Sequence, residues 1–429
     1  MGPRWPLVYP LKVSQPQPPV ALYVHLPFCI ARCPYCDFVV YAGADARGPR
    51  SRTERLYEAI GRELELRADA VDRRFDRPGT GGVDETAREP LRSVYFGGGT
   101  PSLVSGEWFE RLLGIVRSRF GVAPDAEITL EANPGPDERG DLTAFGRLGV
   151  NRVSFGAQSL DGAELRRLGR RHSPEDVAAA VAAARSAGIA SVNLDLLYDV
   201  PSQSVEAWEA TLRAALALAP DHLSLYGLTL DDPDAEGITG LGGDHLPTPP
   251  GARRWRERAR LAQDDDRAAD QYQLATDLLA AEGWLGYEIS NWSRPGRESR
   301  HNLVYWERGP YEAVGPGAHA FDDVTRRWNA AAMEPYIAAL VPLDGVPSAP
   351  PGGEEFITAE VAAAERVILA LRLDRGVPKV WGDEPPLAAA RVWAETSGLL
   401  ELTVLDGEPR LRLTTRGRLL SNELFRRLV

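Results

Sequence analysis

Cysteine and long apolar runs are scarce in this chain of 429 residues, and its 49 basic residues are outnumbered by 61 acidic ones. The three cysteines are Cys29, Cys33 and Cys36, and an odd number within eight positions does not form a disulfide framework, so we expect a reducing cytoplasm. No apolar run approaches the ~18 residues of a membrane span, which leaves at most peripheral membrane contact. The net charge of −12 argues against binding to nucleic acid. The basic run 252–260 is offset by the acidic run 264–266, and this pair predicts a solvated helix face.

Short apolar segments alternate with longer amphipathic segments between Val20 and about Gly227. The expected strands are VALYVHL (20–26), RSVYF (92–96), EITLEAN (127–133), RVSFGAQS (152–159), ASVNLDLL (190–197) and DHLSLYGL (221–228). Helical patterns fall at about 53–70, 105–120, 138–148, 174–187 and 204–218. This alternation predicts an α/β fold with a mostly parallel sheet. In such folds the functional residues follow the carboxyl ends of the strands.

Composition divides the chain into several parts. Residues 1–19 are Pro-rich and lack a continuous apolar stretch, which predicts a loose arm and not a signal peptide. Residues 20–230 form the expected core, and 231–341 contain a polar excursion and a second block that completes it. The tail 354–429 predicts a separate domain of helices, a hairpin over 399–414 and a last helix. Within these parts, the polar segments 71–90 and 231–267 predict a surface loop and a linker.

The cysteines follow the spacing C-x3-C-x2-C. On a compact loop this spacing places three thiolates on one side. A structural zinc ion usually has four ligands, and His25, just upstream, is a candidate fourth. A [4Fe–4S] cluster held by Cys29, Cys33 and Cys36 would instead leave one iron open. The spacing, with Tyr35 before Cys36, resembles that of the radical S-adenosylmethionine (SAM) enzymes, in which SAM completes the cluster and is cleaved to a 5′-deoxyadenosyl radical.

If SAM binds the cluster, the ends of the following strands should carry its other contacts. Residues 97–99 are three glycines at a strand end, where the backbone can approach a ligand closely. Glu131 can accept from ribose hydroxyls or an amine, and Arg170 can pair with a carboxylate. Gln158 and Asp195 end two further expected strands. Each polar residue alone would be interpreted as a cap or surface group, but the series at successive strand ends predicts a ligand site.

Beyond the cysteines, the chain resembles the HemN/HemW family of radical SAM proteins from about Tyr23 onward. The resemblance rests on YVHLPFCIARCPYCDF, FGGGTPS, EANP, RVSFGAQS, LGRRH, NLDLLYDVP and YEISNWSRPGRESRHNLVYW. It implies a partial (β/α)6 radical SAM barrel with a small α+β C-terminal domain. It also implies SAM contacts at Tyr23, Gly98, Gly99, Thr100, Glu131, Gln158, Arg170 and Asp195.

Two features distinguish groups within this family. The oxygen-independent coproporphyrinogen III oxidases carry a fourth cysteine two places after the third, and a longer N-terminal region. This chain has Phe38 at that position and 28 residues before Cys29, as in the heme chaperone group of the family. That group also carries the motif H-N-x-x-Y-W, which is tied to heme binding and is present here as His301, Asn302, Tyr305 and Trp306.

The resemblance therefore implies a heme chaperone that binds a [4Fe–4S] cluster, SAM and heme and delivers heme to a respiratory enzyme. Because a neutral imidazole can ligate heme iron, His301 is the expected heme ligand. His319 is a second candidate without an assigned role, and only Met1 and Met333 could supply a thioether. Three alternatives stay open: a coproporphyrinogen III oxidase that converts propionates to vinyl groups, a heme-degrading radical SAM methyltransferase, and a zinc protein.

Overall fold

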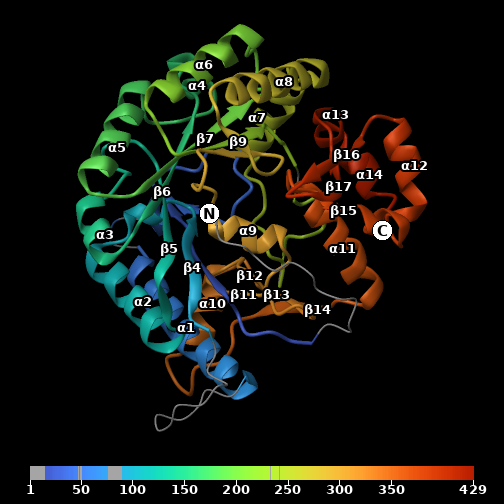
Figure 1. Ribbon diagram of the computed structural model, residues 1–429. Coiled ribbons are helices and arrows are strands. Elements are labelled where there is room, and N and C mark those ends of the chain that lie inside the picture. The colour runs from blue at the N-terminus through green and yellow to red at the C-terminus, as the bar shows by residue number, and fades with distance from the viewer. Residues whose placement is uncertain (1–14, 47, 49–50, 76–88, 232, 241) are drawn as a thin grey trace.

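A curved, mixed sheet organises most of the molecule (Figure 1). The computed structural model describes residues 15–46, 48, 51–75, 89–231, 233–240 and 242–429. The sheet has 12 strands in the order β14-β13-β12-β11-β1-β4-β5-β6-β7-β8-β10-β9. The strands from β11 to β8 in this order run parallel to their neighbours. Among the described residues, the strands at the two ends of this order, β14 and β9, do not pair with each other.

Six strand–helix units make up the parallel part of the sheet. They are β1 (Ala21–Leu26) with α1 (Thr53–Phe75), β4 (Leu91–Gly98) with α2 (Gly106–Arg119), β5 (Val122–Ala132) with α3 (Leu142–Leu148), β6 (Arg152–Gln158) with α4 (Gly162–Arg167) and α5 (Pro174–Ser186), β7 (Ser191–Tyr198) with α6 (Val205–Ala217), and β8 (His222–Gly227) with α7 (Pro250–Arg260) and α8 (Asp265–Ala281). The predicted α/β fold is confirmed, and all six expected strands are present. Figure 1 shows α1, α2, α3, α5 and α6 along the outer side of the sheet.

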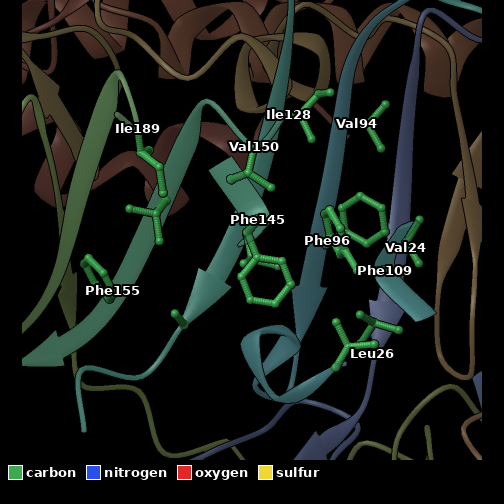
Figure 2. Close-up of a cluster of buried hydrophobic side chains, with 14 of the residues drawn as sticks. Val24, Leu26, Val94, Phe96, Phe109, Ile128, Phe145, Val150, Phe155 and Ile189 are labelled. Carbon is green, nitrogen blue, oxygen red and sulfur yellow. The ribbon is translucent and has the colours of Figure 1, made fainter. Parts of the chain in front are cut away.

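Side chains of the parallel strands alternate between two very different faces. In β4, Val94 and Phe96 point outward into the main hydrophobic core, where Phe96 meets Phe109 of α2 with ring centroids 4.6 Å apart. Phe109 in turn packs edge-on against Phe145 of α3, as Figure 2 shows. The residues between them in β4, such as Tyr95, face the inside of the curve. Because strand side chains alternate with a period of two, the outer face is apolar and the inner face is largely polar.

Short strands beyond the parallel part extend the sheet at both edges. Next to β1 lie β11 (Tyr311–Val314), β12 (His319–Phe321), β13 (Thr325–Asn329) and β14 (Gly352–Phe356), and next to β8 lie β10 (Asn291–Ser293) and β9 (Leu285–Gly286). The sequence pattern predicted none of these edge strands. Helix α9 (Arg300–Trp306) contacts β4 inside the curve, and α10 (Met333–Leu340) packs on α1.

The last part of the chain has a hydrophobic core of its own. Its elements are α11 (Ala359–Arg372), β15 (Val377–Pro378), α12 (Ala388–Thr396), β16 (Leu400–Leu405), β17 (Glu408–Leu413), α13 (Thr415–Leu419) and α14 (Ser421–Phe425). The strands β16 and β17 form the expected hairpin, which β15 extends to three strands.

Two segments differ from the sequence-based expectation. Helix α1 continues to Phe75, so the first five residues of the expected surface loop 71–90 are helical, and residues 76–88 lie outside the described residues. Most of the expected N-terminal arm, 1–14, also lies outside them. The expected linker 231–267 contains helix α7 and the start of α8. Within the described ranges, no helix is both long and apolar enough to cross a bilayer.

Candidate functional site

The three cysteines lie on one loop at the carboxyl end of β1. Cys29 is buried in the short strand β2 (Phe28–Cys29), which pairs with β3 (Tyr41–Ala42), and Cys33 and Cys36 follow in the partly exposed turn between these strands. The backbone N–H of Cys36 donates to the carbonyl of Cys33 over 3.2 Å. All three thiols are free. We call residues 27–42 the cysteine loop.

The glycines after β4 fix the start of the cysteine loop. The Gly99 N–H donates to the Leu26 carbonyl over 2.9 Å, and the Thr100 N–H donates to the Phe28 carbonyl over 2.8 Å. Gly98 has φ +111°, and a side chain there would clash with the His25 ring. These glycines therefore allow close packing within the chain, and their expected contact with a ligand stays a prediction.

A chain of polar side chains connects two of the cysteines. The Thr100 hydroxyl donates to the Cys29 sulfur over 3.3 Å and accepts from Asn133 Nδ2 over 3.1 Å. The Asn133 side-chain oxygen accepts from Arg170, whose Nη1 donates to the Cys33 sulfur over 3.2 Å. Burial raises the pKa of Cys29 to about 11, so in the free protein this residue is a thiol. The network therefore links the sulfur atoms of Cys29 and Cys33 to the positively charged guanidinium of Arg170.

Arg170 is only partly satisfied in this network. Its Nη2 also donates to the Gly156 carbonyl over 2.8 Å, while its buried Nε has no hydrogen-bond partner among the residues that the structure describes. A buried donor without a partner costs roughly 1–3 kcal/mol. A bound anionic group at this position would accept a hydrogen bond from the free Nε and so explain why it lacks a partner in the chain.

A second buried arginine holds the other side of the cysteine loop. Arg256 of α7 donates from Nε to the Pro34 carbonyl over 3.0 Å and from Nη2 to the Cys36 carbonyl over 3.0 Å. It also donates to the Asp231 carbonyl and forms an ion pair with Asp37 over 2.6 Å. The sequence predicted a solvated helix face over 252–260, and the burial of Arg256 was not predicted. Its neighbours in the run are mostly exposed, and a single buried arginine among them leaves no periodic signal.

Two buried carboxylates lie on the inner face of the sheet near the cysteine loop. Glu131 of β5 accepts from the Tyr95 hydroxyl over 2.7 Å and from the Gly98 N–H over 2.9 Å. Burial, with a contribution from the charge of Asp195, raises the pKa of Glu131 to about 7. This carboxylate has backbone and hydroxyl donors and no cation of its own.

Asp195 lies within β7, three residues before its end, and not at the strand end as expected. Its carboxylate accepts from the Ser154 hydroxyl over 2.9 Å and from Asn193 Nδ2 over 2.7 Å. Burial raises its pKa above the ordinary value, although these hydrogen bonds act in the opposite direction. Besides burial, the charge of Asp195 raises the pKa of Glu131, and both carboxylates raise the pKa of Tyr95, so all three side chains face the same space. Together the two carboxylates favour a bound cation.

Two further expected contact residues line this part of the inner face. Tyr23 of β1 stacks on Tyr95 with ring centroids 5.9 Å apart. Gln158 ends β6 with φ +67°, where the register between β6 and β7 shifts. A non-glycine residue in the left-handed region stores strain, and such strain is concentrated at ligand sites. The expected strand residues therefore lie toward one end of the sheet, in the five neighbouring strands β1, β4, β5, β6 and β7.

His25 does not act as a fourth zinc ligand in this arrangement. Its Nε2 lies 2.9 Å from the Val39 carbonyl, which can only accept, so this nitrogen carries the proton. Its Nδ1 accepts from the Tyr23 hydroxyl over 3.0 Å, and burial lowers its pKa to about 4. Among the described residues, no three His, Cys, Asp or Glu side chains are placed to bind one metal ion together. In a [4Fe–4S] cluster each thiolate binds its own iron, which requires no such convergence on one ion.

His301 is a core residue in this structure. Only 1% of it is exposed, its Nδ1 lies 2.9 Å from the Ser93 hydroxyl, and its Nε2 lies 2.8 Å from the Tyr305 hydroxyl. Its backbone N–H donates to Glu127 over 3.1 Å, and burial lowers the pKa of its ring to about 3. Because both ring nitrogens are occupied, the expected heme ligation by His301 requires one of these bonds to break. Here the residue anchors α9 to the inner face of the sheet.

Comparison with known proteins gives a consistent result. Residues 23–215 match the model of the radical SAM superfamily. The heme chaperone HemW of Mycobacterium tuberculosis (strain H37Rv) is 37% identical over 429 residues, which cover 99% of this chain and 98% of that protein. HemW of Escherichia coli K12 is 37% identical over 302 residues, 70% of each protein. The solved structure of coproporphyrinogen III oxidase (HemN) from Escherichia coli has a TM-score of 0.74 at 21% identity, covering 96% of this chain and 91% of that one. At 21% identity, the similarity to the HemN structure shows a shared fold alone.

The Arg256→Ala variant should destabilise the protein. Removing the guanidinium leaves Asp37 and three carbonyls around the cysteine loop without their donor, and we expect the free energy of unfolding to fall by roughly 3 kcal/mol. Urea unfolding followed by tryptophan fluorescence measures this change. Arg258→Ala is the matched control, because Arg258 is exposed on the same helix and bonds only to Arg254. Equal stabilities of the two variants would contradict the role assigned to Arg256.

The pKa of Glu131 predicts a pH dependence that the Glu131→Gln variant should lack. Because the folded-state pKa of about 7 lies above the ordinary 4.5, the folded protein retains a proton that the unfolded chain releases between these values. The stability of the wild type relative to the variant should therefore fall as pH rises from about 5 to about 7, and level off above that. Unfolding of both proteins at several pH values tests this. A constant difference would show that Glu131 ionises normally.

Proposed function

The chain belongs to the radical SAM superfamily and, within it, to the HemN/HemW family, and from this membership we propose that it is a heme chaperone that carries a [4Fe–4S] cluster and SAM. The observation that carries the proposal is the similarity to a heme chaperone over 99% of the chain. Phe38, at the position where the oxidases of the family have a fourth cysteine, supports the same choice.

The proposed cluster ligands are Cys29, Cys33 and Cys36. Three thiolates leave one iron without a protein ligand, and when bound, such a cluster supplies one-electron chemistry to SAM at that iron. The residues around it fit an anionic cluster. Arg170 donates to one cysteine sulfur, and Arg256 holds two carbonyls of the same loop. Burial raises the pKa of Cys29 and so disfavours its thiolate, whereas the charge of Arg170 lowers this pKa and favours the thiolate.

The groups proposed to bind SAM are Glu131, Asp195 and Arg170, together with Tyr23, Gly98, Gly99, Thr100 and Gln158. SAM carries an ammonium and a sulfonium, and the two buried carboxylates, whose pKa values are raised, would be stabilised by a nearby cation. SAM also carries a carboxylate, and the unpartnered Nε of Arg170 is a buried donor suited to one. The charges of this face thus complement those of the ligand.

Heme is the proposed cargo, and a heme-accepting respiratory enzyme is the proposed recipient. The three free thiols support a reducing compartment, so we propose that the protein works in the cytoplasm. A recipient in a membrane would be reached by peripheral contact.

The test separates the chaperone from a coproporphyrinogen III oxidase. The cluster is reconstituted anaerobically in the full chain, and SAM, a reductant and coproporphyrinogen III are added. Protoporphyrinogen and 5′-deoxyadenosine are then assayed in the same tube. A parallel sample is titrated with heme and followed by its visible absorption. We expect heme to bind and coproporphyrinogen III to remain unchanged.

Two results would contradict the proposal. Formation of protoporphyrinogen together with 5′-deoxyadenosine would identify an oxidase in spite of Phe38. A cluster-loaded protein that does not bind heme would not be a heme chaperone. The variant Cys33→Ser serves as the control for cluster loading, because loss of one ligand should reduce bound iron and sulfide in parallel.

A further inference from the structure

Asn133 lies between the two arms of the network that reaches the cysteine sulfurs. Its Oδ1 accepts from Arg170 Nη2. Its Nδ2 donates to Thr100 Oγ1 over 3.1 Å and to Glu138 Oε1 over 3.4 Å. A guanidinium only donates and a carboxylate only accepts, so Arg170 and Glu138 fix which end of the Asn133 amide carries the oxygen. The charged groups on either side therefore determine the orientation of this amide.

The orientation of the amide also sets the direction of the Thr100 hydroxyl. Because Asn133 Nδ2 donates to Thr100 Oγ1, the hydroxyl proton is left for another acceptor. That acceptor is the Cys29 sulfur, 3.3 Å away. Thr100 is buried, and its hydroxyl forms no other hydrogen bond within the part of the chain that the structure describes. The donors therefore point in one direction, from Arg170 toward Cys29.

The backbone around Asn133 favours this arrangement. Asn133 directly follows β5 and precedes Pro134, and the helical region is disfavoured for a residue before proline. In β6, a Cβ at Gly156 would lie 3.3 Å from Asn133 Oδ1 and 3.4 Å from Arg170 Nη2. The contact between these two side chains thus lies in space that a side chain at Gly156 would restrict, and it belongs to the packing of neighbouring strand ends.

Hydrogen bonds to cysteine sulfur influence the reduction potential of an iron–sulfur cluster. Reduction adds one electron to the cluster, and a donor on a ligand sulfur stabilises the added negative charge. Among the described residues, side-chain hydrogen bonds reach cysteine sulfur from Thr100, on Cys29, and from Arg170, on Cys33. Asn133 bonds to both of these donors. A change at Asn133 would therefore reach the sulfurs through Thr100 and Arg170.

We propose that Asn133 is a positioning residue that turns the Thr100 hydroxyl onto the Cys29 sulfur and thereby raises the reduction potential of the [4Fe–4S] cluster. The proposal rests on the proposed function, because it requires a cluster bound through Cys29. Within the segment EANP (131–134), the sequence had assigned an expected role to Glu131 alone.

The Asn133→Asp variant tests the orientation of the hydroxyl. One carboxylate oxygen can still accept from Arg170, but the other cannot donate to Thr100, so the Thr100 hydroxyl should turn toward the carboxylate and leave Cys29. Loss of this hydrogen bond should lower the ratio of reduced to oxidised cluster at a fixed potential about tenfold, which is about 59 mV for one electron. The measurement is an anaerobic redox titration of the reconstituted full chain without SAM, followed by electron paramagnetic resonance.

A double-mutant cycle separates this effect from the new negative charge of Asn133→Asp, which also lowers the potential. Thr100→Val removes the hydroxyl and should itself lower the potential, whereas the matched control Thr100→Ser keeps the hydroxyl and the wild-type potential. In the Thr100→Val background, Asn133→Asp can act only through its charge. Its shift there should therefore be smaller than in the wild type, by about the shift that Thr100→Val causes alone.

The outcomes distinguish this proposal from the proposed function. Equal shifts for Asn133→Asp in the two backgrounds would overturn the role of Asn133, while the cluster and the proposed function stand. Equal potentials of Thr100→Val and Thr100→Ser would overturn it as well, and this comparison remains if Asn133→Asp does not load iron. A wild-type chain that holds no [4Fe–4S] cluster would overturn both. Iron and sulfide content and circular dichroism show which variants are folded and loaded.

Discussion

Two arginines, the partly buried Arg170 and the buried Arg256, hold the part of the cysteine loop that carries Cys33 and Cys36. Arg170 reaches Cys33 from the end of the parallel sheet, and Arg256 reaches the Cys36 carbonyl from α7. The two lie far apart in the chain, so the loop depends on the completed sheet to bring them together. Burial raises the pKa of Cys29 and the charge of Arg170 lowers it, and the residues at the end of β4 bring the backbone close to the start of the loop. This part of the structure therefore forms only when the strand–helix units are assembled.

The alternating faces of the parallel strands place the rest of the site. Outward side chains build the apolar core against the helices, and inward side chains form polar layers. Toward the carboxyl ends of the strands lie Glu131, Asp195 and the cysteine loop. Toward their other ends, the Arg152–Glu127 ion pair and His301 anchor α9 to the inner face. Among the described residues, Arg170 Nε near the cysteine loop has no hydrogen-bond partner, whereas both ring nitrogens of His301 are hydrogen-bonded.

Sequence patterns could predict the parts governed by local periodicity. The strands of the six units and five helices follow from alternating apolar segments, whereas Thr100 was named through the family resemblance and Arg170 through the RLGRRH motif. Other parts depend on contacts between distant segments. The strands β11 to β14 are short and carry no clear alternation, Arg256 lies in a run of exposed arginines, and Asn133 has its role only through Thr100 and Arg170. The motif around His301 indicated a ligand, but the motif alone could not show that Ser93 and Tyr305 occupy both ring nitrogens.

The cysteine loop should hold a cluster with one iron that has no protein ligand. The most direct measurement is iron and sulfide analysis of the anaerobically reconstituted full chain, with electron paramagnetic resonance of the reduced cluster before and after addition of SAM. We predict about four irons and four sulfides per chain, and a spectrum that changes when SAM binds the open iron. A single zinc ion per chain, or a cluster spectrum that SAM leaves unchanged, would contradict this account.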